Sequence, residues 1–126
     1  MRFGWLLGLF LATSVTAHEM TPAYLEFAPT AHSDGVCVTQ IKVFNRRADV
    51  QYYEIEVVDS DWKPIPFAST YRIFKIGYLE TKSIDVYVRD EDADKVTYIC
   101  TLSKLEKDAI TSGAISSRIC SKMKEK

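Results

Sequence analysis

The sequence predicts an all-β fold, a single immunoglobulin-like antiparallel β-sandwich of about seven strands. Short runs rich in Val, Ile, Tyr and Phe recur along residues 23–105, and turn-forming residues separate them. Within these runs apolar and polar residues alternate, which is typical of strands that lie with one face on a core. The alternation is clearest in residues 83–89, where Ile84, Val86 and Val88 are predicted to point inward.

Residues 1–17 have the composition of a secretory signal peptide. Arg2 precedes an apolar run at residues 3–15, and small residues stand before the predicted cleavage site after Ala17. This run is shorter than the roughly 20 apolar residues that a spanning helix needs, and we expect no membrane span in the mature chain. Residues 18–126 are therefore predicted to be one exported domain, either periplasmic or secreted.

Residues 36–59 are predicted to form the centre of the sandwich. Two β-type runs flank a short charged break, a pattern that indicates an antiparallel hairpin. Asn45 is expected to end the first strand, because its side chain can bond to backbone groups at a strand end. The predicted core residues, from this hairpin and two later strands, are Ile41, Val43, Ile55, Val57, Val86 and Tyr98.

The segments around this centre are assigned from the same signals. Residues 18–21 are expected to be a flexible lead-in, and residues 23–27 alternate and predict a first strand that Pro29 ends. Residues 59–66 contain two prolines and are predicted to be a loop. In this loop Trp62 is expected to cover one end of the core, because a large ring is usually mostly buried.

Residues 71–78 predict a short strand with Phe74 and Ile76 on one face and Ile73 and Lys75 on the other.

The C-terminal part is predicted to supply two more strands. Residues 90–94 are acidic and are expected to be a solvated surface turn. Residues 95–105 predict the penultimate strand, and residues 114–124 fit either a strand or a helix. We expect a strand, because the penultimate strand needs a partner. The residues of the penultimate strand predicted to face inward are Val96, Tyr98, Cys100 and Leu102.

The exported domain contains three cysteines, Cys37, Cys100 and Cys120. An odd number in an oxidising compartment predicts one disulfide and one remaining thiol, or an intermolecular bond. A hairpin between the last two strands would place Cys100 opposite Cys120, and we favour this pairing. The alternative pairing is Cys37 with Cys100, which would tie the two sheets together through the core.

The order of these features resembles the N-terminal immunoglobulin-like domain of periplasmic pilus chaperones, the usher-pathway assembly factors. The four similar pieces are an alternating strand ending in Asn at residues 38–45, a Tyr-led strand and Pro-rich loop at 53–67, a hairpin at 71–88 and an Asp-led strand at 94–102. The resemblance covers residues 36–105, and it implies the sandwich fold and a habit of pairing strands with protein partners.

The sequence departs from that family at the site where the chaperones hold the terminal carboxylate of their subunits. The family uses an Arg near the N-terminus and a Lys on the last strand. Residues 23–27 contain no Arg, and Cys120 stands where the Lys would fall. We therefore do not expect this anchoring site here.

The first functional hypothesis is an exported binding or assembly module without enzymatic activity. A partner strand would pair with the edge of the last strand by β-augmentation. The predicted docking residues are Ile115, Arg118, Ile119 and Met123. The alternative is that these residues complete the core and that basic residues protect the edge, as in most stable sandwiches.

The second hypothesis is copper binding. Cleavage after Ala17 would make His18 the N-terminal residue, so that its α-amine and imidazole could chelate copper together. His32 and Met20 would be the further ligands. A third possibility is a purely structural envelope or virion protein.

Other classes of function are not expected from the sequence. It contains no Ser-His-Asp or Cys-His arrangement, no Gly-rich phosphate loop and no Cys-x-x-Cys motif, so we expect neither an enzyme nor a cofactor. The net charge of −1 gives no electrostatic basis for binding nucleic acid.

Overall fold

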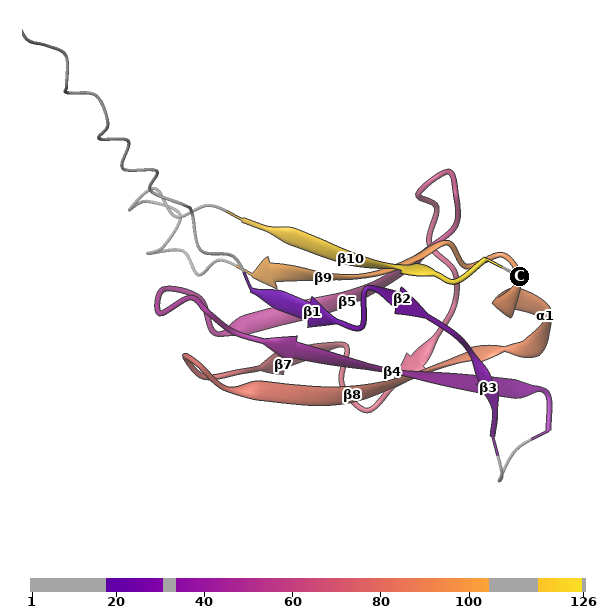
Figure 1. Ribbon diagram of the computed structural model, residues 1–126, viewed down its shortest axis with the longest axis horizontal. Helices are drawn as coiled ribbons and strands as arrows, with labels where there is room; N and C mark the ends of the chain where they lie inside the picture. The colour runs from indigo at the N-terminus through magenta and orange to yellow at the C-terminus, as the bar shows by residue number, and fades with distance from the viewer. Residues whose placement is uncertain (1–17, 31–33, 105–115, 126) are drawn as a thin grey trace, which may run out of the picture.

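The computed structural model describes residues 18–30, 34–104 and 116–125 (Figure 1). In this part of the chain, two β-sheets pack face to face, which confirms the predicted all-β sandwich. The predicted signal peptide at residues 1–17 lies outside the described residues.

The strands are β1 (Glu19–Thr21), β2 (Tyr24–Leu25), β3 (Ala28–Pro29), β4 (Val36–Phe44), β5 (Tyr52–Val58), β6 (Ala68–Ser69), β7 (Ile73–Lys75), β8 (Thr81–Arg89), β9 (Tyr98–Lys104) and β10 (Arg118–Met123), and the short helix α1 is Asp90–Ala93. The first sheet has the order β1-β4-β8-β6, with β3 also paired to β4. The second sheet has the order β2-β10-β9-β5-β7. These orders correspond to the A-B-E-D and G-F-C arrangement of an immunoglobulin-type sandwich.

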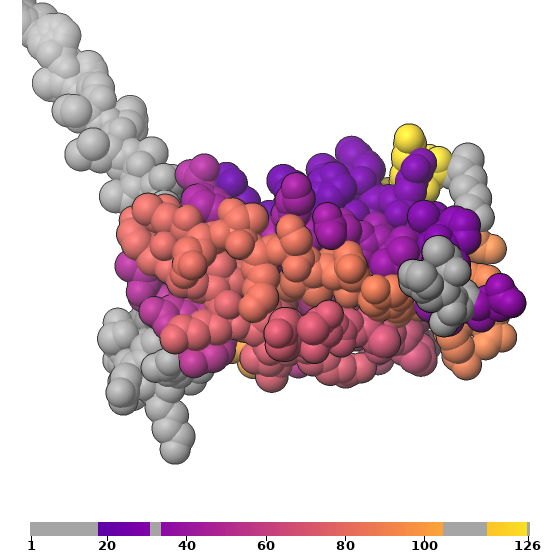
Figure 2. All heavy atoms as spheres, turned by 90° about the horizontal axis from the view of Figure 1, so that it is seen from below, coloured from indigo at the N-terminus to yellow at the C-terminus, as the bar shows by residue number. Residues whose placement is uncertain are grey.

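Figure 2 looks onto the outer face of the first sheet. The N-terminal strands and β4, in indigo and purple, lie along one side of β8, in orange, and the pink segment that contains β6 lies along the other side. The main pairing of this sheet is between β4 and β8, from Val36 opposite Arg89 to Phe44 opposite Thr81.

The core lies between the two sheets, where alternate residues of each long strand point inward. Five of the predicted core residues are buried there, with exposures of 0–3 %: Ile41, Val43, Ile55, Val57 and Val86. Burial of an aliphatic side chain of this size contributes about 1.5–3 kcal/mol, so these residues supply much of the driving force for folding.

The predicted hairpin at residues 36–59 is wrong, because β4 and β5 belong to different sheets. The buried side chain of Asn45 holds the crossing between them. Its Nδ2 donates to the carbonyl oxygens of Val50 and Ile76 at 2.8 and 2.9 Å. Its Oδ1 accepts from the Arg47 N–H at 2.8 Å and from the Tyr53 hydroxyl. Asn45 thus ends β4, as predicted, and also connects the two layers.

The inward face of β9 is the opposite of the predicted one. Ile99, Thr101 and Ser103 are buried toward the core, whereas Tyr98 is only partly buried and lies on the outer face. Trp62 is 48 % exposed and stacks on Tyr98 with ring centroids 4.7 Å apart. The expectations that Tyr98 is a core residue and that Trp62 covers the core are therefore both wrong, since the two rings pack on each other outside the sheet.

The N-terminal segment also differs from the prediction, because it is ordered from its first described residue. The expected flexible lead-in forms β1, in which Met20 is buried. The predicted strand at residues 23–27 is divided. Its first part, β2, pairs in parallel with β10, and the chain then moves to the first sheet, where β3 pairs with β4.

The acidic segment is not fully solvated. It forms α1, and the carboxylate of Asp92 is buried beside Arg89, with Nη2 and Oδ2 2.9 Å apart. The Lys95 ammonium lies 3.7 Å from the other oxygen of Asp92. These two cations make burial of one acidic side chain possible, which the composition of the segment did not indicate.

Candidate functional site

The predicted docking strand, β10, is not at the edge of its sheet. It pairs with β9 from Arg118 to Lys122 and with β2 at Lys122 and Met123. Ile119 and Met123 are partly buried against the core, and Arg118 lies on the outer face. Ile115 lies outside the described residues. The apolar residues of β10 therefore complete the core rather than form an exposed docking face.

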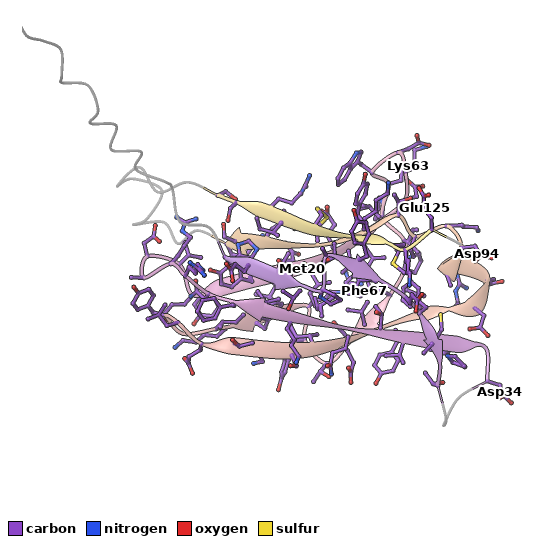
Figure 3. The ribbon with its side chains drawn as sticks, in the orientation of Figure 1. Met20, Asp34, Lys63, Phe67, Asp94 and Glu125 are labelled. Carbon is purple, nitrogen blue, oxygen red and sulfur yellow. A yellow bond between two sulfur atoms is a disulfide. The ribbon has the colours of Figure 1, made fainter. Side chains whose placement is uncertain are left out.

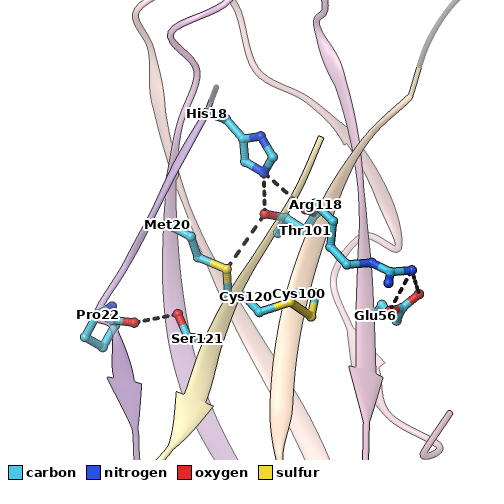
Figure 4. The surroundings of a disulfide bond; sticks show 9 residues. All are labelled: His18, Met20, Pro22, Glu56, Cys100, Thr101, Arg118, Cys120 and Ser121. Carbon is cyan, nitrogen blue, oxygen red and sulfur yellow. Dashed lines mark hydrogen bonds and ion pairs between the residues drawn. A yellow bond between two sulfur atoms is a disulfide. The ribbon is translucent and has the colours of Figure 1, made fainter. Parts of the chain in front are cut away.

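The disulfide joins Cys100 and Cys120, which lie directly opposite each other on β9 and β10 (Figure 4). This is the favoured of the two predicted pairings. The bond lies on the outer face of the second sheet, yet Cys100 is 0 % exposed. Arg118 reaches across this face to the Glu56 carboxylate at 3.4 Å, and its guanidinium lies 5.7 Å from the centre of the Trp62 ring. Cys120 is only partly buried, so the disulfide is covered on the β9 side and partly open on the β10 side.

Cys37 is the free thiol and is buried at the start of β4. Its Sγ lies 3.6 Å from the Val88 carbonyl oxygen, a weak hydrogen bond. Burial raises the pKa of the Cys37 thiol, and the nearby carboxylate of Asp90 raises it further. The thiol is therefore held in its protonated, less reactive form.

The side chains of His18 and Met20, two of the predicted copper ligands, are buried against β9 (Figure 4). The Nε2 of His18 lies 3.1 Å from the Thr101 carbonyl oxygen and 2.8 Å from the Thr101 hydroxyl. A carbonyl can only accept, so Nε2 carries the hydrogen and Nδ1 accepts from the Ser117 hydroxyl at 3.1 Å. Burial lowers the pKa of the His18 imidazole.

This environment occupies both ring nitrogens of His18 with hydrogen bonds. The Met20 sulfur accepts from the Thr101 hydroxyl at 3.7 Å. The third predicted ligand, His32, lies outside the described residues. Within the described ranges, no group of three or more His, Cys, Asp or Glu side chains is arranged to hold a metal ion.

The second sheet has its free edge at β7. The Ile55 N–H donates to the Arg72 carbonyl at 3.0 Å, and the Ile76 N–H donates to the Gln51 carbonyl at 2.8 Å. Because backbone groups alternate in direction along a strand, those of Ile73 and Lys75 point away from β5. This edge therefore presents backbone donors and acceptors to solvent.

Large exposed apolar side chains gather around this edge. Among the described residues seven are strongly exposed, and five of them lie on β7, beside it or in the turn that follows: Tyr52, Tyr71, Ile73, Tyr78 and Leu79. We call these five residues the β7 surface. Tyr52 is directly opposite Lys75 in the sheet, and Ile73 is 53 % exposed. The sequence signal for this surface was Ile73, an apolar residue on the otherwise polar face of its strand.

Two cations contact aromatic rings in or next to the β7 surface. The ammonium of Lys82 lies 4.7 Å from the centre of the Tyr71 ring. The guanidinium of Arg72 lies 4.6 Å from the centre of the Phe67 ring. Such contacts are attractive, and they hold the rings in place beside the edge.

The described ranges contain no helix with the length and apolar composition of a membrane span. A disulfide such as Cys100–Cys120 is typical of an extracellular or periplasmic protein, since cytosolic thiols are kept reduced.

Comparison with known proteins gives similarity of fold but not of sequence. No family model and no curated protein matches the chain. The crystal structure of the E. coli chaperone DraB matches 85 % of this chain with a TM-score of 0.58 and 16 % identity. The match covers 53 % of DraB, so the chain spans about half the length of that chaperone. A FixG-related protein from Vibrio parahaemolyticus has a TM-score of 0.49 and 12 % identity, over 89 % of this chain and 99 % of that chain.

The similarity to DraB supports a distant chaperone-like fold. It agrees, at the level of the fold, with the resemblance found in the sequence.

Proposed function

We propose that this protein is an exported binding module without enzymatic activity, which takes an extended segment of a partner protein as an additional strand beside β7. The observation that carries the proposal is the β7 surface, where exposed apolar side chains surround a free sheet edge. In such pairing the partner's main chain provides affinity and its alternate side chains provide specificity.

The β7 edge supports this function better than the β10 edge of the sequence prediction. β2 covers part of β10, and the Ser121 hydroxyl donates to the Pro22 carbonyl at 2.6 Å, which holds the N-terminal segment against that strand. The backbone groups of Ile73 and Lys75 have no neighbouring strand among the described residues. An added strand would therefore displace none of the described strands at β7.

The side chains define what the partner segment would contact. Ile73 and Lys75 point to the outer face of the sheet, where Glu54 lies opposite Ile73 and Tyr52 lies opposite Lys75 on β5. Every second residue of a paired segment would lie beside these side chains, so we expect apolar residues at alternate positions. Lys75 discourages indiscriminate pairing, because a charged residue on an edge strand protects it from aggregation.

The test uses hydrogen exchange together with a substitution of the edge. Partners would be captured from the native envelope on the immobilised protein, and an extended peptide from each would be titrated. We expect protection of the Ile73 and Lys75 amide hydrogens on binding. Ile73→Pro should abolish binding, because proline removes an outward N–H without removing a hydrogen bond to β5.

The matched control is Tyr24→Ala, which removes an exposed aromatic ring from the opposite edge of the same sheet. It should leave binding unchanged. Protection that appears at β10 instead of β7, or an Ile73→Pro variant that folds and binds normally, would contradict the proposal.

A further inference from the structure

A large cleft lies at the end of the sandwich farthest from the β7 surface, and the strand-pairing proposal does not use it. Its volume is about 900 Å³. The β2–β3 segment, α1 and the end of β10 surround it, in the region where the N-terminal segment crosses between the sheets. In Figure 3 the label of Asp94 marks its α1 side and that of Glu125 its β10 side. We call it the end cleft.

The floor of the end cleft is apolar. Leu25, Cys37 and Val96 are buried beneath it, and Phe27 and Met123 pack against the core at its sides. A volume of several hundred Å³ with an apolar lining and a few polar groups is typical of sites for small organic ligands. The floor therefore favours an aliphatic or aromatic body.

The rim of the end cleft is mainly acidic. Its charged residues are Glu26, Asp90, Asp94, Lys122, Lys124 and Glu125. Lys124 is paired with Glu26 at 3.3 Å, so these two charges largely cancel. Lys122 lies on the same face of β10 as Cys120, which is the outer face and points away from the space between the sheets.

The neighbouring cations of α1 do not change this balance. Arg89 contacts Glu91 and Asp92, and Lys95 contacts Asp92, and none of these four residues lines the cleft. The Asp90 carboxylate lies close enough to the buried Cys37 thiol to raise its pKa, which places negative charge beside the apolar floor. The electrostatic potential at the mouth should therefore attract cations.

We propose that the end cleft binds a cationic amphiphile, an aliphatic or aromatic body that carries an ammonium or guanidinium group. The body would lie against Phe27, Val96 and Met123, and the cation would lie between Asp90 and Glu125. A free amphipathic amine and a lysine or arginine side chain in an apolar peptide share this chemistry.

The experiment is an NMR titration of the isotope-labelled protein with three probes of equal chain length: octylammonium, octanol and octanoate. We expect shifts of the Ala93, Val96 and Thr97 amide signals. Octylammonium should bind about tenfold more tightly than octanoate, since attraction to the exposed carboxylates of Asp90 and Glu125 contributes an energy of that order. Equal affinities, or shifts confined to other residues, would overturn the proposal.

Two kinds of variant separate the floor from the rim. Ala93→Phe should fill the cleft and weaken all three probes, and Ala28→Phe serves the same purpose if the first variant does not fold. Asp90→Asn combined with Glu125→Gln should remove the preference for the cation and leave octanol unchanged. Glu80→Gln, at the other end of the sandwich, is the matched control. If the three probes bound Ala93→Phe, or Ala28→Phe in its place, as tightly as the wild type, the end cleft would not be their binding site.

A further titration with peptides distinguishes the two sources of the cation, a free amine and a side chain of a protein segment. A capped pentapeptide with a central lysine between leucines is compared with its norleucine analogue. Tighter binding of the lysine peptide than of octylammonium assigns the cleft to a protein segment, and the reverse order assigns it to a free amine. Because the signals followed belong to α1 and the segment before β9, the result is independent of binding at β7.

Discussion

The two lateral sides of the sandwich differ in the contacts that hold the strands together there. On one side, β1 and β2 bridge the sheets, His18 bonds to Thr101 across the gap, and a disulfide joins β9 to β10. On the other side, β6 and β7 are strands of two and three residues that belong to different sheets, and exposed apolar side chains surround them. We call these the closed side and the open side.

The difference shows that a small sandwich can keep the contacts that stabilise it on one side and the surface that binds a partner on the other. The closed side uses buried polar groups whose partners come from specific positions, which fixes one arrangement of the N-terminal strands. On the open side, backbone groups of β7 and exposed apolar side chains have no strand beside them among the described residues. A site that must accept another chain is expected where few internal contacts would be lost.

The largest expected effect is loss of the disulfide on the closed side. Replacing Cys100 and Cys120 by Ala together should destabilise the fold by about 3 kcal/mol, the value expected for a loop of this length. The two residues are separated by 20 positions in the sequence. Urea denaturation at pH 7 measures the change. Cys37→Ala, which removes a buried thiol but no cross-link, is the control and should cost less.

The next effect is expected for His18→Ala, which would open the closed side at β1. The imidazole packs 4.7 Å from the Tyr53 ring and bonds to Thr101 and Ser117. Its loss leaves buried polar groups without partners, so we expect a cost of about 2 kcal/mol at pH 7. Hydrogen exchange should show faster opening of β1 than of β8. Equal exchange in both strands would show that His18 does not hold β1.

A smaller effect is expected from acid. Burial lowers the pKa of His18 below the ordinary imidazole value of 6.5, so that below this pH the unfolded chain binds a proton that the folded chain does not. Stability from His18 is therefore complete above 6.5 and falls as the pH drops toward the folded pKa. Denaturation curves between pH 8 and 5.5 should show this loss in the wild type. A weaker pH dependence in His18→Gln would confirm the assignment.

The smallest effect on stability is expected on the open side. Ile73→Thr should change the free energy of unfolding by no more than about 0.5 kcal/mol, because the side chain is exposed. Partner binding should nevertheless weaken severalfold. The same substitution at Tyr24 is the control and should affect neither quantity. A large loss of stability in Ile73→Thr would mean that the two sides do not differ in the way described.

Much of the fold could be predicted because the inward positions of the long strands are regular. Val86 and Val88 on β8 are buried as their alternation predicted, and Cys100 lies opposite Cys120. The crossing between β4 and β5 could not be recognised, because a short charged connection looks the same between two sheets as within one. The contacts that decide it converge on Asn45 from distant segments.

The sites were harder to predict, since they depend on long-range partners. Thr101 lies on the inward face of β9 with Ile99, and its buried hydroxyl finds a hydrogen-bond partner in His18, which is far away in the sequence. The alternation of apolar residues in the sequence predicted instead that Tyr98 and Cys100 face inward. The β7 surface depends on where the neighbouring strand stops, and the end cleft on how the N-terminal segment crosses between the sheets. Neither the end of the neighbouring strand nor the crossing of the N-terminal segment can be predicted from a local sequence pattern.

The stack of Trp62 on Tyr98 also provides an optical reporter. The sequence contains two tryptophans, and a chain without residues 1–17 retains only Trp62. Its indole lies over the strand face that carries the disulfide, and disulfides quench indole emission. Reduction of the bond should therefore brighten the intrinsic fluorescence, so the covalent state of this protein can be followed without any label.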